Sequence, residues 1–191
     1  MLGHAQQAAI RTLSHHRHDW MNDLQIVYGY LRLNKPDRAA EIVDRIRAKM
    51  DNDSRISQLG HAELSLFLLS FPTMSDHMRL EVSVPDGLSL DRLPLDADRL
   101  AGQLIGLVHL FRFRAASAAQ SVQNVLRISM SQSEGAFRVE LEYEGEWAAS
   151  QGLVQEAAEL LADWGQLTEE ESTAAKPGQT GRLFITYPLT A

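Results

Sequence analysis

Hydrophobic residues recur every three or four positions through the first part of the chain, which is the spacing of one face of an α-helix. Residues from about 3 to 33 contain no proline and predict one long helix. A second, polar stripe carries His18, Asn22, Gln25 and Gly29. The apolar face gathers Ile10, Leu13, Trp20, Met21, Leu24, Val27, Tyr28 and Leu31.

A short turn after this helix predicts a helical hairpin. The run from Asn34 to Asp37 contains an Asn that tolerates the left-handed region and Pro36, which suits the first position of a helix. Residues from about 36 to 57 then form a second helix that must pack antiparallel to the first. One partner helix cannot cover the apolar face of the first helix, so we expect two hairpins to form a four-helix bundle. The second helix buries Ala39, Ile42, Val43, Ile46, Met50 and Ile56.

The pattern changes after Gly60 and becomes typical of an α+β fold. Strands are expected to pair antiparallel with their neighbours, and 169–181 to form a mobile, acidic loop. The chain therefore divides into a hairpin domain, 1–58, and an α+β domain, 59–191. Helices are predicted at 61–71, 96–118 and 153–164, and strands at 78–84, 122–130, 137–143 and 183–187.

Composition narrows the class of protein. The chain has 191 residues, 45% of them hydrophobic and 23% charged, which is ordinary for a globular protein. It has no cysteine, which excludes disulfides and thiol catalysis and suits the cytoplasm. No apolar run reaches about 18 residues, so we expect no membrane span and no signal peptide. A net charge of −7 argues against nucleic-acid binding.

His18 is the candidate for chemistry because it lies on the polar stripe of the first helix. A solvated imidazole is partly neutral at cellular pH and is then nucleophilic, as a phosphoryl-accepting histidine must be. The neighbouring His15 and His16 also raise the possibility of a metal site, with His15 and Asp19 one turn apart. No further Cys or His pair with ligand spacing follows, so we predict no metal site in this chain.

The segment from Ser14 to Gln25, Ser-His-His-Arg-His-Asp-Trp-Met-Asn-Asp-Leu-Gln, followed by Gly29 and Leu31, resembles the sporulation initiation phosphotransferase B family. A similar Arg-His-Asp-x-x-Asn signature occurs in the dimerisation helices of related sensor histidine kinases. The resemblance is dense over residues 13 to 33. It implies a homodimer with a four-helix bundle and a kinase-like C-terminal domain. It also implies a phosphohistidine at His18 that carries phosphate between two response regulators in a sporulation phosphorelay.

The residues around His18 suggest distinct roles. His18 would be the nucleophile, and Arg17 would help to neutralise the phosphoryl oxygens. Asp19 would orient the imidazole or tune its basicity, and Asn22 would hydrogen-bond the ring or the docked partner. Trp20 and Met21 are expected in the core. The divalent metal, Mg²⁺, is expected to arrive with the response regulator, and the regulator to dock on the stripe of His18, Asn22, Gln25 and Gly29.

The C-terminal half lacks the motifs that a related kinase uses for ATP. The helix 96–118 contains no Asn, and Glu144-Gly145-Glu146-Trp147 stands where Asp-x-Gly-x-Gly is expected. The last strand, within 181–189, nevertheless resembles that of the kinase fold. We therefore predict a degenerate kinase-like domain without a cofactor, in a phosphorelay phosphotransferase. The alternatives are an autophosphorylating histidine kinase and a non-catalytic dimeric adaptor for response regulators.

Overall fold

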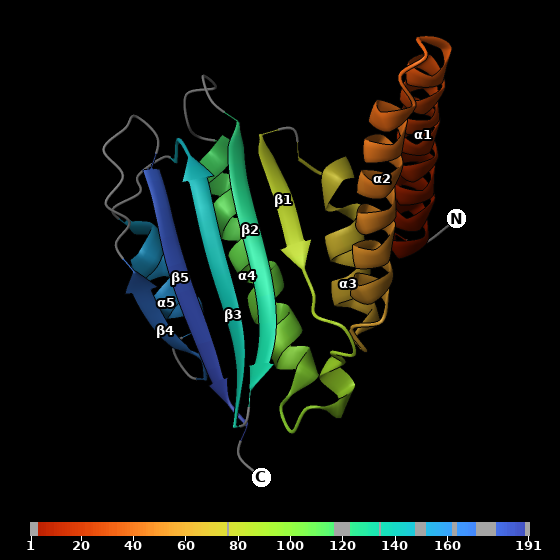
Figure 1. Ribbon diagram of the computed structural model, residues 1–191. Helices are drawn as coiled ribbons and strands as arrows, with labels where there is room; N and C mark the ends of the chain where they lie inside the picture. The colour runs from red at the N-terminus through yellow and green to blue at the C-terminus, as the bar shows by residue number, and fades with distance from the viewer. Residues whose placement is uncertain are drawn as a thin grey trace.

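A long helical hairpin stands beside a five-stranded sheet in the computed structural model of the chain (Figure 1). The structure describes residues 4–75, 77–116, 123–133, 135–147, 152–161, 164–170 and 179–189. The predicted fold class, a helical hairpin followed by an α+β part, is confirmed. The helices are α1 (His4–Arg32), α2 (Pro36–Ser57), α3 (Ala62–Ser70), α4 (Ala97–Ala116) and α5 (Leu153–Leu161). The strands are β1 (Met78–Ser83), β2 (Asn124–Ser133), β3 (Ala136–Gly145), β4 (Gln166–Glu170) and β5 (Gln179–Pro188), with short 3₁₀ turns at Phe71–Thr73 and Leu90–Arg92.

The turn between α1 and α2 follows the sequence prediction closely. Asn34 adopts a positive φ of 56°, and the Lys35 N–H donates to the Tyr30 carbonyl at 2.9 Å. Pro36 begins α2, where its missing N–H costs no helical hydrogen bond. The two helices therefore run antiparallel, side by side, and pack against each other (Figure 1).

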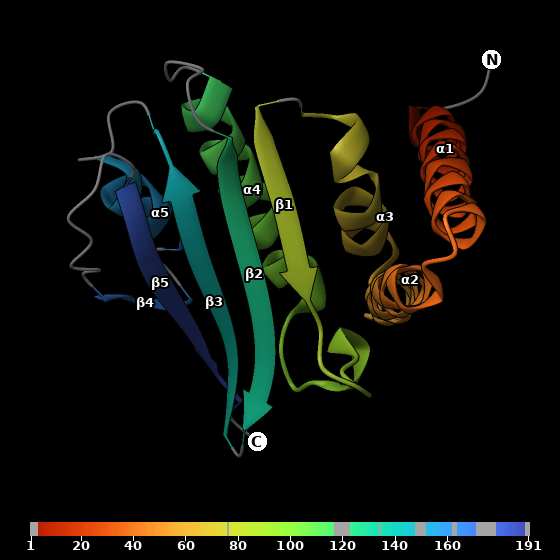
Figure 2. The same cartoon turned by 45° about the horizontal axis from the view of Figure 1, so that its top comes forward.

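The sheet has the strand order β1-β2-β3-β5-β4. Helices α4 and α5 cover one of its faces, and α3 lies between the β1 edge and the hairpin (Figures 1 and 2). The prediction that neighbouring strands are antiparallel is wrong for one pair, because β1 and β2 are parallel. The chain between them crosses over through α4, and a helical crossover brings the next strand back in the same direction.

The predicted loop at 169–181 and the predicted helix at 153–164 both differ from the structure. Residues 169–170 lie in β4 and residues 179–181 lie in β5, and these two strands pair with each other. The helix predicted at 153–164 ends at Leu161, and Trp164 N–H donates to the Leu161 carbonyl at 3.0 Å in a turn. The centre of the predicted mobile loop, 171–178, lies outside the described residues.

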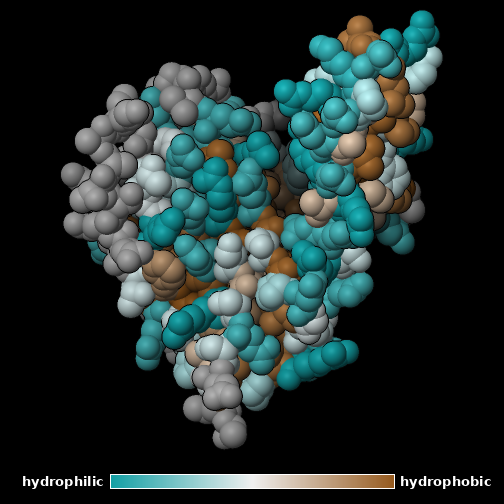
Figure 3. Space-filling view, viewed as in Figure 1, coloured by the Kyte–Doolittle hydropathy of each residue, from teal (hydrophilic) through white to brown (hydrophobic). Residues whose placement is uncertain are grey.

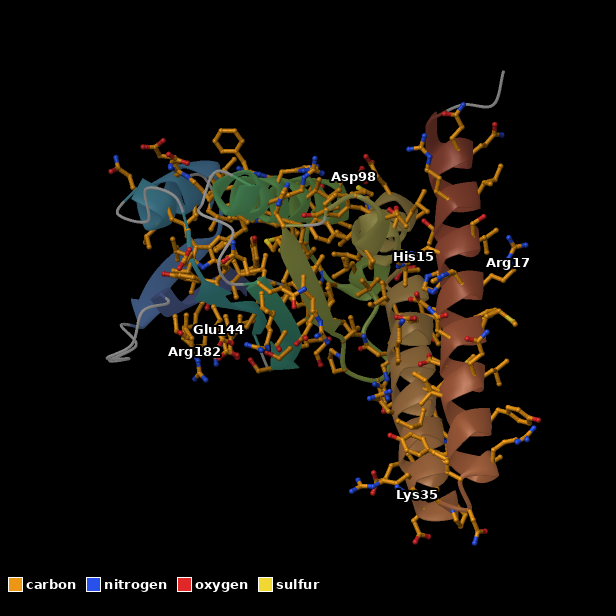
Figure 4. The ribbon with its side chains drawn as sticks, turned by 90° about the horizontal axis from the view of Figure 1, so that it is seen from above. His15, Arg17, Lys35, Asp98, Glu144 and Arg182 are labelled. Carbon is orange, nitrogen blue, oxygen red and sulfur yellow. The ribbon has the colours of Figure 1, made fainter. Side chains whose placement is uncertain are left out.

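The sheet face opposite the helices carries a row of alternating charges. In register, Glu81 of β1 neighbours Arg127 of β2, which neighbours Glu142 of β3, which neighbours Arg182 of β5. The Arg127 guanidinium lies 3.1 Å from Glu81 and 3.9 Å from Glu142. Figure 4 shows Arg182 on this face, away from α4 and α5. Cross-strand pairs of opposite charge stabilise a sheet modestly and keep its open face hydrated.

The end of α2 is built into the core of the C-terminal part. Ile56 is buried, Leu59 is fully buried, and both belong to the same apolar cluster as the inner face of the sheet. Leu90 N–H donates to the Leu59 carbonyl at 2.8 Å, and the Asn52 amide donates to the Val82 carbonyl at 2.6 Å. The hairpin is thus fixed in orientation relative to the sheet.

The apolar face of α1 stays exposed in the single chain. Trp20 and Met21, expected in the core, are 49% and 53% exposed, and Leu24 is 61% exposed. On α2, Val43 and Met50 are also exposed rather than buried. Hydrophobic side chains are visible along the outer side of the hairpin in Figure 3. None of the described helices combines the length and the apolar content needed to cross a membrane.

Candidate functional site

His18 lies near the middle of α1 with its side chain open to solvent. The side chain is 74% exposed, and its Nδ1 lies 3.2 Å from Nδ2 of Asn22, one turn further along the helix. The spacing of four residues places the two side chains on the same face of the helix. Asn22 thus engages one ring nitrogen and limits rotation of the imidazole.

Asp19 points from α1 toward α2 and is much less exposed than His18. Its side chain is 29% exposed, and its Oδ2 lies 3.3 Å from Lys49 Nζ on α2. The same oxygen lies 3.7 Å from His15 Nε2, and Oδ1 lies 4.0 Å from His18 Nδ1. The carboxylate therefore lies between two imidazoles and a lysine, in the seam between the two helices.

The other candidate residues, Arg17, Gln25 and Gly29, also lie on α1 but point in different directions. Figure 4 shows Arg17 pointing away from the C-terminal part, whereas His15 lies on the side of α1 that faces it. Gln25 is exposed, and a Cβ added at Gly29 would have no heavy atom within 4 Å outside the helix's own backbone. The polar stripe predicted from the sequence therefore has free space beside Gly29. The structure does not bring the Arg17 side chain next to Asp19.

A cleft of about 810 Å³ lies between the hairpin and the β1 edge of the sheet. It is visible as a hollow between the two parts in Figure 3. His15, Asp19 and Asn22 line it from α1, so the site extends from the exposed face of the helix into this hollow. Its other charged lining residues include Arg45, Lys49 and Asp53 of α2 and Arg79 and Glu81 of β1.

Asp53 is a half-buried carboxyl in the wall of this cleft. Burial raises the pKa of Asp53 because it disfavours the charged form, while the positive charges of His16 and Lys49 act in the opposite direction. Burial is the larger effect. The ionised form of Asp53 therefore lowers the free energy of unfolding at neutral pH.

Sequence analysis missed Lys49 because it lies 30 residues from Asp19. A signal was present, since Asp19 and Lys49 each lie 15 residues from Asn34 and an antiparallel hairpin folded there places them opposite each other. For the metal alternative, the described residues contain no group of three or more His, Cys, Asp or Glu side chains placed to hold an ion.

Packed aromatic side chains occupy the two segments that lack the nucleotide-binding motifs of a related kinase. Phe111 of α4 is fully buried, and its ring centroid lies 5.4 Å from those of Tyr143 and Trp147. Trp147, which lies two residues after the end of β3, is itself buried. Three residues after Phe111 on α4, Arg114 forms an ion pair with Glu156 of α5. In this protein, α4 and the residues at the end of β3 therefore contribute aromatic side chains to the core.

Comparison with known proteins finds a family whose model matches the hairpin. The family described as "Sensor kinase SpoOB-type, alpha-helical domain" matches residues 3–59. Sporulation initiation phosphotransferase B of Bacillus subtilis (strain 168) is 34% identical over 102 residues. That alignment covers 53% of this chain and 52% of the relative, so the chain spans about half the length of the relative it matches.

Similar solved structures include histidine kinases at low identity. Histidine kinase AdeS of Acinetobacter baumannii is 14% identical with a TM-score of 0.43, covering 91% of this chain and 98% of that chain. A histidine kinase from Burkholderia phymatum STM815 has the same identity and TM-score and covers all of both chains. Histidine kinase ThkA in complex with the response regulator TrrA is 15% identical with a TM-score of 0.43, covering 94% and 61%.

The shifted pKa of Asp53 predicts a pH-dependent gain in stability for Asp53→Asn. Because the folded-state pKa is raised, ionised Asp53 destabilises the fold at neutral pH, and this penalty disappears as the pH falls through the folded pKa toward 3.8. The variant should therefore be more stable at pH 7, by no more than about 1 kcal/mol since water screens a half-exposed group. The gain should vanish near pH 4. Urea unfolding across this range tests it, with Asp51→Asn as the exposed control; an equal gain at both pH values would contradict it.

Proposed function

We propose that this chain is a phosphorelay phosphotransferase, because residues 3–59 match the model of the SpoOB-type sensor kinase alpha-helical domain family. His18 accepts a phosphoryl group from the aspartate of one response regulator and passes it to the aspartate of another. The observation that carries the proposal is the geometry of His18, an exposed imidazole whose Nδ1 is engaged by Asn22 within the family-matched segment. The name of the Bacillus subtilis relative supports sporulation initiation as the pathway.

The transfer takes place in two displacement steps. In the first, the lone pair of His18 Nε2 attacks the phosphorus of an aspartyl phosphate, an N–P bond forms, and the O–P bond breaks to release the aspartate carboxylate. In the second, the carboxylate of another regulator attacks phosphorus and the N–P bond breaks. Nε2 is the attacking atom because Asn22 and Asp19 both approach Nδ1.

Asp19 and Asn22 support the charge that develops on the ring. An imidazole that keeps its Nδ1 proton becomes positive when Nε2 takes up the phosphoryl group. The Asp19 carboxylate, with Oδ1 4.0 Å from Nδ1, stabilises this charge. The Asn22 amide, whose Nδ2 lies 3.2 Å from Nδ1, would accept the Nδ1 proton through its Oδ1 after rotation of the amide group by 180°. Arg17, the residue before His18, would help to neutralise the phosphoryl oxygens of a docked regulator.

The C-terminal part supports a phosphotransferase over a kinase. The segments that would carry a metal-binding Asn and an Asp-x-Gly-x-Gly loop instead supply Phe111, Tyr143 and Trp147 to one aromatic cluster. We propose that the chain needs no nucleotide and that Mg²⁺ enters with the response regulator. The partners and the absence of cysteine both suit the cytoplasm.

We further propose that the chain works as a homodimer. The apolar face of α1 leaves seven large side chains exposed, which is far more apolar surface than a monomer normally presents on one helix. A second hairpin laid against it completes a four-helix bundle. The face consists of Ile10, Leu13, Trp20, Met21, Leu24, Tyr28 and Leu31.

His18→Gln should abolish phosphorylation. Incubation with a phosphorylated response regulator should place acid-labile phosphate on the unmodified chain, and no label should remain in the variant because the nucleophile is gone. His15→Gln and His16→Gln are matched controls on the same helix and should keep the label. Undiminished labelling of His18→Gln would sink the proposal, and labelling from ATP without a regulator would favour the kinase alternative. Regulator binding without labelling would favour the adaptor.

Gly29→Leu should separate docking from folding. The added side chain meets nothing within the chain and replaces a poor helix former, so the melting temperature should hold or rise. It projects into the stripe where the regulator docks and should slow phosphoryl transfer by on the order of 100-fold, since small misplacements of the reacting atoms are costly. Gly102→Leu, at an equally open position of α4, is the control. Normal transfer by folded Gly29→Leu would show that the regulator docks elsewhere.

Leu24→Asp should split the dimer. An unpaired carboxylate buried between two hairpins costs several kcal/mol, whereas in a monomer the same side chain stays in water. Light scattering at micromolar concentration should give a dimer for the unmodified chain and a monomer for the variant. Leu160→Asp changes an exposed leucine of α5 and should leave the dimer intact. A monomeric unmodified chain would refute the dimer.

A further inference from the structure

We propose that Lys49 of α2 is a positioning residue for phosphoryl transfer at His18, acting through Asp19. The inference rests on the proposed function of His18 and adds a residue from the second helix of the hairpin. Lys49 Nζ lies 3.3 Å from Asp19 Oδ2, and the opposite oxygen of Asp19 lies 4.0 Å from His18 Nδ1. The three side chains thus form one chain of charge from α2 to the imidazole.

Lys49 fixes the orientation of the Asp19 carboxylate between the imidazoles of His15 and His18. Asp19 Oδ2 also lies 3.7 Å from His15 Nε2, so the carboxylate has two histidines within reach on the same helix. Lys49 contacts this oxygen and leaves Oδ1 facing His18. Without Lys49, the carboxylate is free to turn toward His15 and lose its contact with His18.

The orientation of Asp19 matters because of the two imidazole tautomers. A carboxylate oxygen facing Nδ1 favours the tautomer that carries its proton on Nδ1. That tautomer leaves the lone pair on Nε2, which is the atom that attacks. By fixing Asp19, Lys49 raises the population of the reactive form, although it never touches the phosphoryl group.

The surroundings of Lys49 suit this role better than general stabilisation. The Lys49 and Asp19 side chains are 53% and 29% exposed, and an ion pair this open contributes little to folding. The half-buried Asp53 on α2 also interacts with Lys49 and with His16, which provides a second anion to hold the ammonium group beside the seam. Asp23 and Arg45 also line the cleft.

Five variants of this chain test the proposal. Lys49→Met should slow phosphoryl transfer about two- to fivefold, the range expected for loss of an exposed ion pair. Lys49→Arg should restore most of the rate because it keeps the cation. In an Asp19→Asn background, adding Lys49→Met should have no further effect if Lys49 acts only through Asp19. Arg47→Met, on the same helix with an 80% exposed side chain paired to Asp51, is the matched control.

A spectroscopic readout separates this proposal from the proposed function. The ring nitrogen chemical shifts of His18, assigned by their absence in His18→Gln, report the tautomers in the unphosphorylated protein. Lys49→Met should lower the Nδ1–H population, and Arg47→Met should not. Unchanged spectra, a faster rate in Lys49→Met, or equal effects of the two variants would overturn the role of Lys49. If the unmodified chain takes up no phosphate, the proposed function fails while the spectra still decide the role of Lys49.

Discussion

Burial of the last turn of α2 in the core of the C-terminal part determines the geometry of the whole chain. Ile56 and Leu59 join the apolar cluster beneath the sheet, and the backbone of Leu59 bonds to that of Leu90. A side chain of this size contributes about 1.5–3 kcal/mol when it is buried, so the two residues act as an anchor. Because α1 is tied to α2, the position of His18 relative to the sheet follows from this anchor.

The hairpin has faces of different polarity around its helix axes. Its outer face is apolar and exposed, whereas the seam between α1 and α2 is polar where Asp19 meets Lys49. A charged pair there stabilises little, because both side chains remain in contact with water. The seam is therefore tolerated because the anchor supplies the packing, and it leaves charged groups next to the His18 imidazole.

Periodicity predicted the parts of the fold that depend on local sequence. The two hairpin helices, the turn at Asn34 and α4 were all visible, because each contains a long repeat or a distinctive turn residue. The parallel β1–β2 pair and the short, acidic β4 were missed, because pairing partners are chosen by tertiary contacts that no local pattern records.

The candidate site shows the same division. His18 and Asn22 lie one turn apart on one helix, so spacing alone placed them together. Lys49 belongs to another helix, so its position beside Asp19 could be predicted only from the register of the two helices. The exposure of Trp20 and Met21 depends on which surface of the first helix the second helix covers. The aromatic cluster of Phe111, Tyr143 and Trp147 joins three elements and had no signature in the sequence.

The turn at Asn34 has a consequence for how such a chain can evolve. Asp19 and Lys49 are equidistant from it, so the turn sets which residues of the two helices face each other. One residue inserted there would rotate α2 by about 100° and shift it by about 1.5 Å relative to α1. The anchor would hold the far end of α2 in place, and the mismatch would fall on the seam beside His18. The length of this turn is therefore constrained as well as its sequence, because a change of length would disturb the candidate site from 15 residues away.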